Sequence, residues 1–272
     1  MTRQSARAIS FELDSPELAQ TYDRVSDRQF DHGKVLIEAL APQSGEQVLD
    51  VGCGTGRLGD HVASLVAPTG EVFGIDPLPL RIDLAARKHP RFHAQVGRAE
   101  DLSAFPTSRF DVLYANSVLH WIADKPCALG EAWRVLKSGG RIGVNSADAD
   151  RAHQSAGLVR DAVIEEGLRD LAEASTFGTD HRVTGDELAR LLNEAGFRDV
   201  RVTPHTFVDR VRDVDDLIAW SLSSSFGNFL AGLDDSQRAR VRERLKAKLE
   251  ALRSREGIRL ERYLVFATAR KG

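Results

Sequence analysis

The sequence is poor in cysteine and has no long apolar run. Its 272 residues include only two cysteines, Cys53 and Cys127, too few for a disulfide framework or a cysteine-based zinc site. No apolar stretch approaches the length of a membrane span, and Met1 to Phe11 contain no apolar segment of the kind found in secretory signals. We therefore expect a cytoplasmic protein that is neither exported nor inserted into a membrane.

The sequence also lacks a strong excess of one charge. The 37 basic residues nearly balance the 40 acidic ones, which leaves a net charge of −3 and no global attraction to nucleic acid or to an anionic membrane. There is no internal repeat and no low-complexity tract. We expect a small-molecule partner, no nucleic-acid or membrane partner, and a monomer or homodimer.

Short apolar runs alternate with helical patterns between residues 47 and 147. The runs predicted to be strands are Gln47–Val51, Glu71–Ile75, Phe92–Val96, Asp111–Ala115 and Arg141–Val144. Such alternation is typical of parallel strands joined by crossover helices. A helix is predicted from Asp124 to Leu136, and Gly139 and Gly140 permit the left-handed turn that follows it. The fold class predicted is α/β with a doubly wound sheet.

Longer helical patterns follow Ala147. They cover Arg151–Ala174, Thr184–Ala195, Asp215–Leu222 and Asp234–Arg255, with strands predicted at Val200–Phe207 and Leu260–Ala269. We interpret the chain as a single domain over residues 1–272. Its core is predicted at about 34–150, 184–208 and 258–272, and a helical cap that decides specificity at about 1–33, 151–182 and 209–257.

The most informative segment is an apolar strand that leads into three alternating glycines, Val48-Leu49-Asp50-Val51-Gly52-Cys53-Gly54-Thr55-Gly56. Glycine lets a backbone approach a ligand closely, and the N-terminus of the following helix offers free N–H groups to an anionic part. Asp76, twenty residues beyond Gly56, ends the next strand, where a carboxylate accepts hydrogen bonds from ribose hydroxyls. The pattern indicates an adenosine-containing ligand, with a simple tight turn as the alternative. Because the third glycine comes one residue too early for G-x-G-x-x-G, it argues against NAD.

The segment Asp50 to Gly56 resembles the signature of class I S-adenosylmethionine-dependent methyltransferases of the type 11/12 group. Further matches follow in order: Gly74-Ile75-Asp76, Ala99-Glu100-Asp101-Leu102, Phe110-Asp111-Val112 and Leu136-Lys137-Ser138-Gly139-Gly140. The resemblance spans about Tyr22 to Arg141. It implies a mostly parallel seven-stranded sheet with a final antiparallel hairpin, and an enzyme whose cofactor is S-adenosyl-L-methionine and whose product is S-adenosyl-L-homocysteine.

The same resemblance implies which residues hold the cofactor. They are Tyr22, Asp50, Gly52, Cys53, Gly54, Gly56, Asp76, Pro77, Ala99, Glu100 and Asn116. The glycines and Asp50 hold the methionine part in the family, and Ala99 and Glu100 lie beside the adenine. Tyr22 either closes over the cofactor or packs the N-terminal helix. Arg98 stands where many relatives have an acidic residue, which puts contacts to the adenine amino group in doubt.

Two further stretches bear on the methyl acceptor: Tyr22-x6-Gln29-x2-His32-Gly33 and Asn116-Ser117-Val118-Leu119-His120-Trp121. Both resemble a subgroup that esterifies carboxylic acids, such as juvenile hormone acid and trans-aconitate methyltransferases. In that subgroup the amide at the Gln29 position and the indole N–H at the Trp121 position hydrogen-bond the substrate carboxylate. A carboxylic acid is ionised at neutral pH and needs no general base. The alternative role for Trp121 is that of a core aromatic.

Other acceptors stay open. N-, C- or phenolic O-methylation of a small metabolite would call for a base, and His120 and His32 are the nearby imidazoles. Asp148 and Asp150 form an acidic pair, which we interpret as loop acids rather than a metal site, so no metal is expected. An alternative of another class is a protein that keeps the cofactor fold but acts as a non-enzymatic binding module. The intact Asp50, Asp76 and glycines argue against it.

Overall fold

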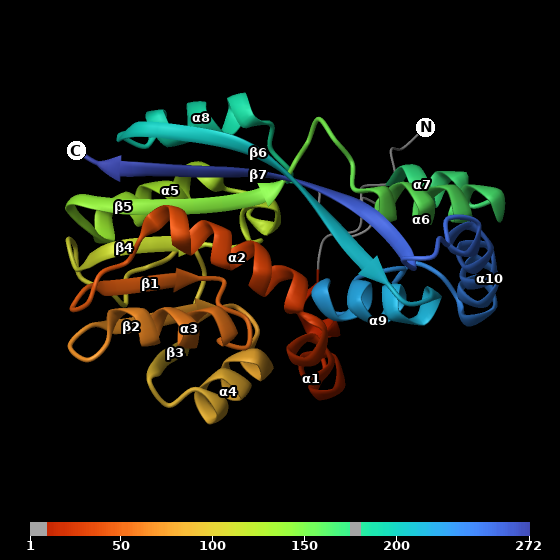
Figure 1. Ribbon diagram of the computed structural model, residues 1–272, viewed down its shortest axis with the longest axis horizontal. Coiled ribbons are helices and arrows are strands. Elements are labelled where there is room, and N and C mark those ends of the chain that lie inside the picture. Colours follow the sequence, from red (N-terminus) through yellow and green to blue (C-terminus); the bar gives the residue numbers. More distant parts are fainter. Residues whose placement is uncertain (1–9, 175–180) are drawn as a thin grey trace. The chain divides into compact units, whose positions relative to one another are not determined.

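The structure is a computed structural model that describes residues 10–174 and 181–272 (Figure 1). The chain divides into two compact units. The larger unit comprises Asp23–Asp150, His181–His205 and Leu264–Gly272, and the smaller comprises Met1–Tyr22, Arg151–Asp180 and Thr206–Tyr263. The glycine segment lies in the larger unit.

A seven-stranded sheet runs in the order β3-β2-β1-β4-β5-β7-β6. Its strands are β1 Gln47–Val51, β2 Glu71–Asp76, β3 Phe92–Val96, β4 Phe110–Ala115, β5 Leu136–Ala147, β6 Phe197–Val211 and β7 Ile258–Lys271. The neighbouring pairs among β1 to β5 are parallel, and β7 is antiparallel to β5. The predicted mostly parallel seven-stranded sheet is therefore confirmed. β6 and β7 each continue from the larger unit into the smaller one.

Helices cover both faces of this sheet. Those of the larger unit are α2 Asp27–Leu40, α3 Arg57–Val66, α4 Pro79–Lys88, α5 Lys125–Val135 and α8 Gly185–Glu194. A Cβ at Gly143 of β5 would meet Leu36 and Leu40 of α2, whereas Ile142 and Val144 belong to the core cluster shared with α5. Successive residues of a strand point to opposite faces, so α2 and α5 lie on opposite sides and the sheet is doubly wound.

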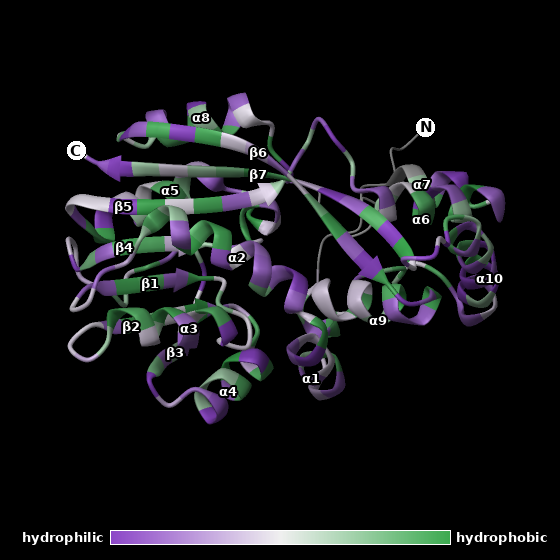
Figure 2. Cartoon of the chain, in the orientation of Figure 1, coloured by the Kyte–Doolittle hydropathy of each residue, from purple (hydrophilic) through white to green (hydrophobic). Residues whose placement is uncertain are grey.

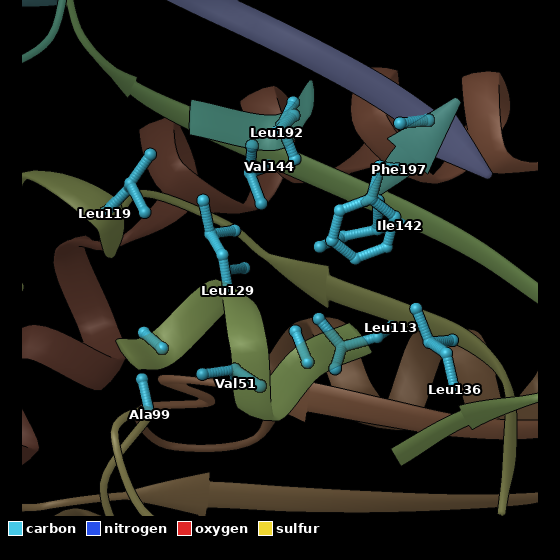
Figure 3. Close-up of a cluster of buried hydrophobic side chains, with 14 of the residues drawn as sticks. Val51, Ala99, Leu113, Leu119, Leu129, Leu136, Ile142, Val144, Leu192 and Phe197 are labelled. Atoms are coloured by element: carbon cyan, nitrogen blue, oxygen red, sulfur yellow. The ribbon is translucent and has the colours of Figure 1, made fainter. Parts of the chain in front are cut away.

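One core cluster of the larger unit lies between the sheet and the helices α5 and α8. Figure 3 shows Val51, Leu113, Ile142 and Val144 of the strands facing Leu129 of α5. In Figure 2 hydrophobic residues recur along these strands and along the helices beside them, interrupted by hydrophilic ones. This burial explains why short apolar runs were sufficient to predict the strands.

Several element boundaries differ from those predicted, most clearly at the start of β5 and in the segment Arg151–Ala174. β5 begins at Leu136 rather than Arg141, because Leu136 pairs with Phe110 before the register shifts and Arg141 pairs with Val112. The helix predicted from Arg151 to Ala174 is divided into α6 Gln154–Glu165 and α7 Arg169–Ala174. Gly167 lies between them with a φ of +77°, a conformation that ends a helix.

The smaller unit has its own apolar core. It contains α6, α7, α9 Val214–Ser224 and α10 Asp235–Ala251, together with the short 3₁₀ turn η1 Phe11–Leu13 and most of α1 Pro16–Val25. α10 buries Val241, Leu245 and Leu249, and its basic face makes ion pairs to Glu165 and Glu166 of α6. Within residues 10–174 and 181–272, no helix is long and apolar enough to cross a membrane.

Candidate active site

The glycine loop joins β1 to the N-terminus of α3. Gly52, Gly54 and Gly56 have φ values of +76°, +55° and +82°, in the left-handed region that side chains disfavour. A Cβ at Gly52 would also lie 2.2 Å from Cγ2 of Val118. Both the turn and the close approach of the segment after β4 therefore require glycine at position 52.

Asp76 lies against this loop at the end of β2. One carboxylate oxygen accepts a hydrogen bond from the Gly54 N–H at 2.9 Å and the other accepts from the Leu78 N–H at 3.0 Å. The carboxylate is buried and is oriented by these two backbone groups. The structure thus brings together the glycines and the acidic residue that the sequence assigned to one ligand.

Asp50, two residues before Gly52, is buried in β1 and accepts a hydrogen bond of 2.7 Å from the Tyr114 hydroxyl. Burial raises the pKa of Asp50 to about 8, the bond from Tyr114 opposes that rise, and the negative charge of Asp76 adds to it. Burial also raises the pKa of the neighbouring Cys53 thiol well above its usual value. Because a thiolate is the reactive form of cysteine, Cys53 serves the loop as a small apolar residue.

The residues predicted beside the adenine follow β3. Ala99 is buried in the core cluster, whereas Glu100 is partly exposed and lies 3.7 Å from Arg98 in an ion pair. Arg98 thus forms an ion pair with the same carboxylate that the resemblance assigns to cofactor binding. Pro77 separates Asp76 from Leu78 at the end of β2. The cofactor roles of Ala99, Glu100 and Pro77 stay predictions.

The two stretches assigned to the acceptor are joined directly. The Asn116 side chain, at the end of β4, donates a hydrogen bond of 2.9 Å to the backbone carbonyl of Gln29 in α2. A Cβ at Gly33 would lie 3.0 Å from the same Asn116 nitrogen. Leu58 of α3 is nearer still, with its Cδ2 2.5 Å from that Cβ, so the glycine makes room for both Leu58 and Asn116 against α2.

His120 and Trp121 lie in the 3₁₀ turn η2 Leu119–Trp121. The Ala147 N–H donates a hydrogen bond of 3.2 Å to Nδ1 of the buried His120, so the neutral ring carries its proton on Nε2. The ring centroids of His120 and Trp121 are 5.5 Å apart. Leu119 is the residue of this turn that enters the core (Figure 3), whereas Trp121 is partly exposed.

The remaining candidates are less closely tied to this site. Tyr22 belongs to the smaller unit, so its role toward the cofactor stays a prediction. His32 is buried in α2. Asp148 accepts a hydrogen bond from the Asp150 N–H in a local turn, and the described part of the chain holds no group of three potential metal ligands.

Two residues of the site, Tyr114 and Asn145, belong to no motif of the sequence. Tyr114 is the hydrogen-bond donor to Asp50, and Asn145 of β5 binds both Asn116 and the Ser117 N–H. Their signal would have been a polar side chain inside an otherwise apolar strand. Without a known partner, such a residue does not reveal what it contacts.

A glycine loop with two buried acidic side chains, Asp50 of β1 and Asp76 of β2, fits the methionine and ribose parts of S-adenosylmethionine, and the sheet order is that of class I methyltransferases. A family model described as a methyltransferase domain matches residues 42–196, and the chain belongs to this family. It is a methyltransferase that uses S-adenosylmethionine, as the sequence predicted.

Individual relatives agree with this assignment. Trans-aconitate 2-methyltransferase from Deinococcus radiodurans is 29% identical over 221 residues, which cover 79% of this chain and 83% of the relative. The protein of the same name from Methylobacterium radiotolerans is 28% identical over 228 residues, or 80% and 83% of the two chains. The fold is similar to that of the YcgJ protein from Bacillus subtilis, with a TM-score of 0.58 and 17% identity over 89% of this chain and 98% of the other.

Proposed function

We propose that the chain methylates a carboxylate oxygen of a small carboxylic acid. The observation that carries this proposal is the hydrogen bond between Asn116 and the Gln29 carbonyl, because it joins the two stretches that resemble the carboxyl-methylating subgroup. The two trans-aconitate 2-methyltransferases support it, since their names specify a carboxylic acid as substrate.

The reaction is a direct displacement that depends on placement. When bound, S-adenosylmethionine supplies an electrophilic methyl group on sulfur. A carboxylate oxygen forms the new O–CH₃ bond as the S–CH₃ bond breaks and its electron pair passes to sulfur, so no proton moves. The acceptor oxygen must be held about 3–3.5 Å from the methyl carbon and in line with the bond that breaks. In the proposed site, the Gln29 amide and the Trp121 indole N–H hold the carboxylate by donating hydrogen bonds.

The hydrogen bond at His120 favours an acceptor that needs no base. With the Ala147 N–H donating to Nδ1 and the proton on Nε2, the neutral ring accepts another proton only by breaking that bond. A phenol or an ammonium group would have to lose a proton before or during methyl transfer. An ionised carboxylate has none to lose, so its methylation needs no base at this position.

The acceptor atom is tested with S-adenosylmethionine that carries tritium in its methyl group. Trans-aconitate and a set of aliphatic and aromatic monocarboxylic acids would be offered, each acid beside its primary amide, its alcohol and a matched phenol or amine. We expect label only in the acids, and we expect dilute hydroxide to release it as volatile methanol, which identifies a methyl ester. Label in a phenol or an amine that resists hydroxide would contradict the proposal.

A further inference from the structure

We propose that Asn145 is a positioning residue for methyl transfer, which fixes the orientation of Asn116 and of the turn that carries Trp121. Asn145 lies near the end of β5 and has no exposed surface. On the same strand, Val144 precedes it and Ala147 follows two residues later, and both are buried apolar residues, while the intervening Ser146 is also buried. Burying an amide among them costs free energy unless all its hydrogen-bonding groups are matched, so its partners explain why it is there.

Asn145 is the centre of a hydrogen-bond relay. The Ser117 N–H donates to Asn145 Oδ1 at 2.6 Å. Asn145 Nδ2 donates to Asn116 Oδ1 at 2.7 Å, and Asn116 Nδ2 donates to the Gln29 carbonyl at 2.9 Å. The relay therefore connects β5, the end of β4 and α2.

The two ends of this relay determine its direction. At one end a backbone N–H of Ser117 can only donate, and at the other a backbone carbonyl of Gln29 can only accept. Each amide between them therefore has one orientation that satisfies both neighbours. If either amide were turned over, two oxygens or two N–H groups would face each other. Asn145 thus determines which edge of the Asn116 amide faces α2.

β5 holds the same loop at a second point. Ser117 has a φ of +60°, a conformation that costs free energy for a residue other than glycine, and the bond from its N–H to Asn145 stabilises it. Two residues further along β5, the Ala147 N–H donates to His120. The chain between these two anchors is short, and Trp121 follows directly. The position of Trp121 therefore depends on β5.

The test rests on the proposed cofactor role of Asn116 and uses S-adenosylmethionine itself as the probe. In Asn145→Asp the shape is kept, but an ionised carboxylate cannot donate to Asn116. We expect the Kd measured by calorimetry, at the highest pH at which the wild type still folds and binds and at which the introduced carboxyl is ionised, to rise roughly tenfold relative to wild type, as for the loss of a buried hydrogen bond. Burial raises the pKa of a carboxyl group. At lower pH the protonated group donates again, and the ratio of variant to wild-type Kd should fall toward one.

Two variants serve as comparisons. Asn193→Asp makes the same change on the exposed face of α8, where the amide donates to the Ala189 carbonyl, and its Kd should match wild type. Asn116→Ala removes the residue through which Asn145 acts. In that background Asn145→Asp should add little to the loss of affinity, because residues of one network are not additive.

Each outcome decides the proposal. A wild-type Kd for Asn145→Asp at every pH overturns it. A loss of affinity that is independent of pH and undiminished in the Asn116→Ala background also overturns it, because such a loss would indicate an effect on packing alone. A wild-type Kd for Asn116→Ala shows that Asn116 has no role in cofactor binding, and the positioning role of Asn145 fails with it.

If Asn145→Asp does not fold, amide hydrogen exchange decides instead. We then expect residues 116–121 to exchange faster in Asn116→Ala than in wild type, and unchanged exchange overturns the proposal.

Discussion

The Tyr114 hydroxyl donates a hydrogen bond to Asp50 inside the sheet, where the two residues are register partners on β4 and β1. Burial is the main reason that the pKa of Asp50 rises to about 8, and the charge of Asp76 adds to the effect. At neutral pH the folded protein therefore keeps a proton on Asp50 that the unfolded chain releases. Asp50 lies two residues before the glycine loop, so its protonation affects both the stability of the fold and the candidate cofactor site.

This linkage predicts how stability depends on pH. Asp50 has a folded pKa of about 8 against 3.8 for the unconstrained group. Between these values the folded state binds more protons, so the contribution of Asp50 is fully present below pH 3.8 and is lost as pH rises through 8. Asn at position 50 keeps an acceptor for Tyr114 and does not titrate. We expect the free energy of unfolding, measured in urea at pH 5 and pH 7.5, to fall less in Asp50→Asn than in wild type.

The exposed Asp83 of α4 provides a matched control for this measurement. Asp83→Asn should keep the wild-type change between the two pH values. Equal pH dependence in wild type and Asp50→Asn would show that Asp50 is ionised in the folded protein.

Asp76→Ala should weaken the binding of S-adenosylmethionine. The variant removes the proposed acceptors for the ribose hydroxyls and leaves the Gly54 N–H, now 2.9 Å from Asp76 Oδ2, without its partner. Loss of two hydrogen bonds to a charged group corresponds to about 2–3 kcal/mol, which calorimetric titration would detect as a large increase in Kd. Asp83→Ala is the control and should bind as wild type does. An unchanged Kd for Asp76→Ala would disprove the ribose assignment.

The strands and the glycine loop could be predicted from the sequence because their signals are local. β1 and β3 begin and end at the predicted residues. β1 is a buried apolar run, whereas β3, at the edge of the sheet, buries only Phe92 and is delimited by the turn residues around it. The closeness of Gly52 and Asp76 could also be predicted from the sequence. Gly52 follows β1, Asp76 ends β2, and these two strands are neighbours in the sheet. In these places the chemistry depends on residues close in sequence or on neighbouring strands.

The relay through Asn145 was not predictable in the same way. Asn145 and Asn116 are 29 residues apart, and Asn116 and Gln29 are 87 apart, so no periodicity connects them. The start of β5 was missed for a related reason. Lys137 to Gly140 carry turn residues, yet the pairing of Leu136 with Phe110 extends the strand through them. Tertiary contacts, which local preference does not encode, decide both features.

Trp121→Phe should lower turnover more than stability. The change keeps most of the apolar bulk and removes the indole N–H that is proposed to hold the acceptor carboxylate. Because Trp121 is partly exposed and Leu119 is the residue of the turn in the core, we expect the midpoint of thermal unfolding to stay within a few degrees of wild type. We expect kcat/KM for the acid acceptor to fall about tenfold or more, as for a hydrogen bond to a charged group.

Trp133→Phe is the comparison for this variant, since Trp133 lies on α5 with 37% of its surface exposed and belongs to no proposed site. It should keep wild-type turnover. Full activity with a wild-type melting point in Trp121→Phe would remove Trp121 from the acceptor site.

Asp209→Ala should destabilise the smaller unit. Both Nε and Nη2 of Arg262 donate to Asp209 Oδ2, at 2.8 and 2.6 Å, with both side chains buried and the guanidinium 4.3 Å from the Trp220 ring centroid. Loss of one partner leaves a buried charge uncompensated, which costs about 3–5 kcal/mol. Urea unfolding should show this loss, whereas Glu256→Ala, which removes an exposed ion pair with Arg259, should cost under about 1 kcal/mol.

If the unpaired charge is the cause of the instability, changing Arg262 to Met in the Asp209→Ala variant should restore part of the stability. A double variant as unstable as Asp209→Ala would instead indicate that Asp209 acts through its other contacts.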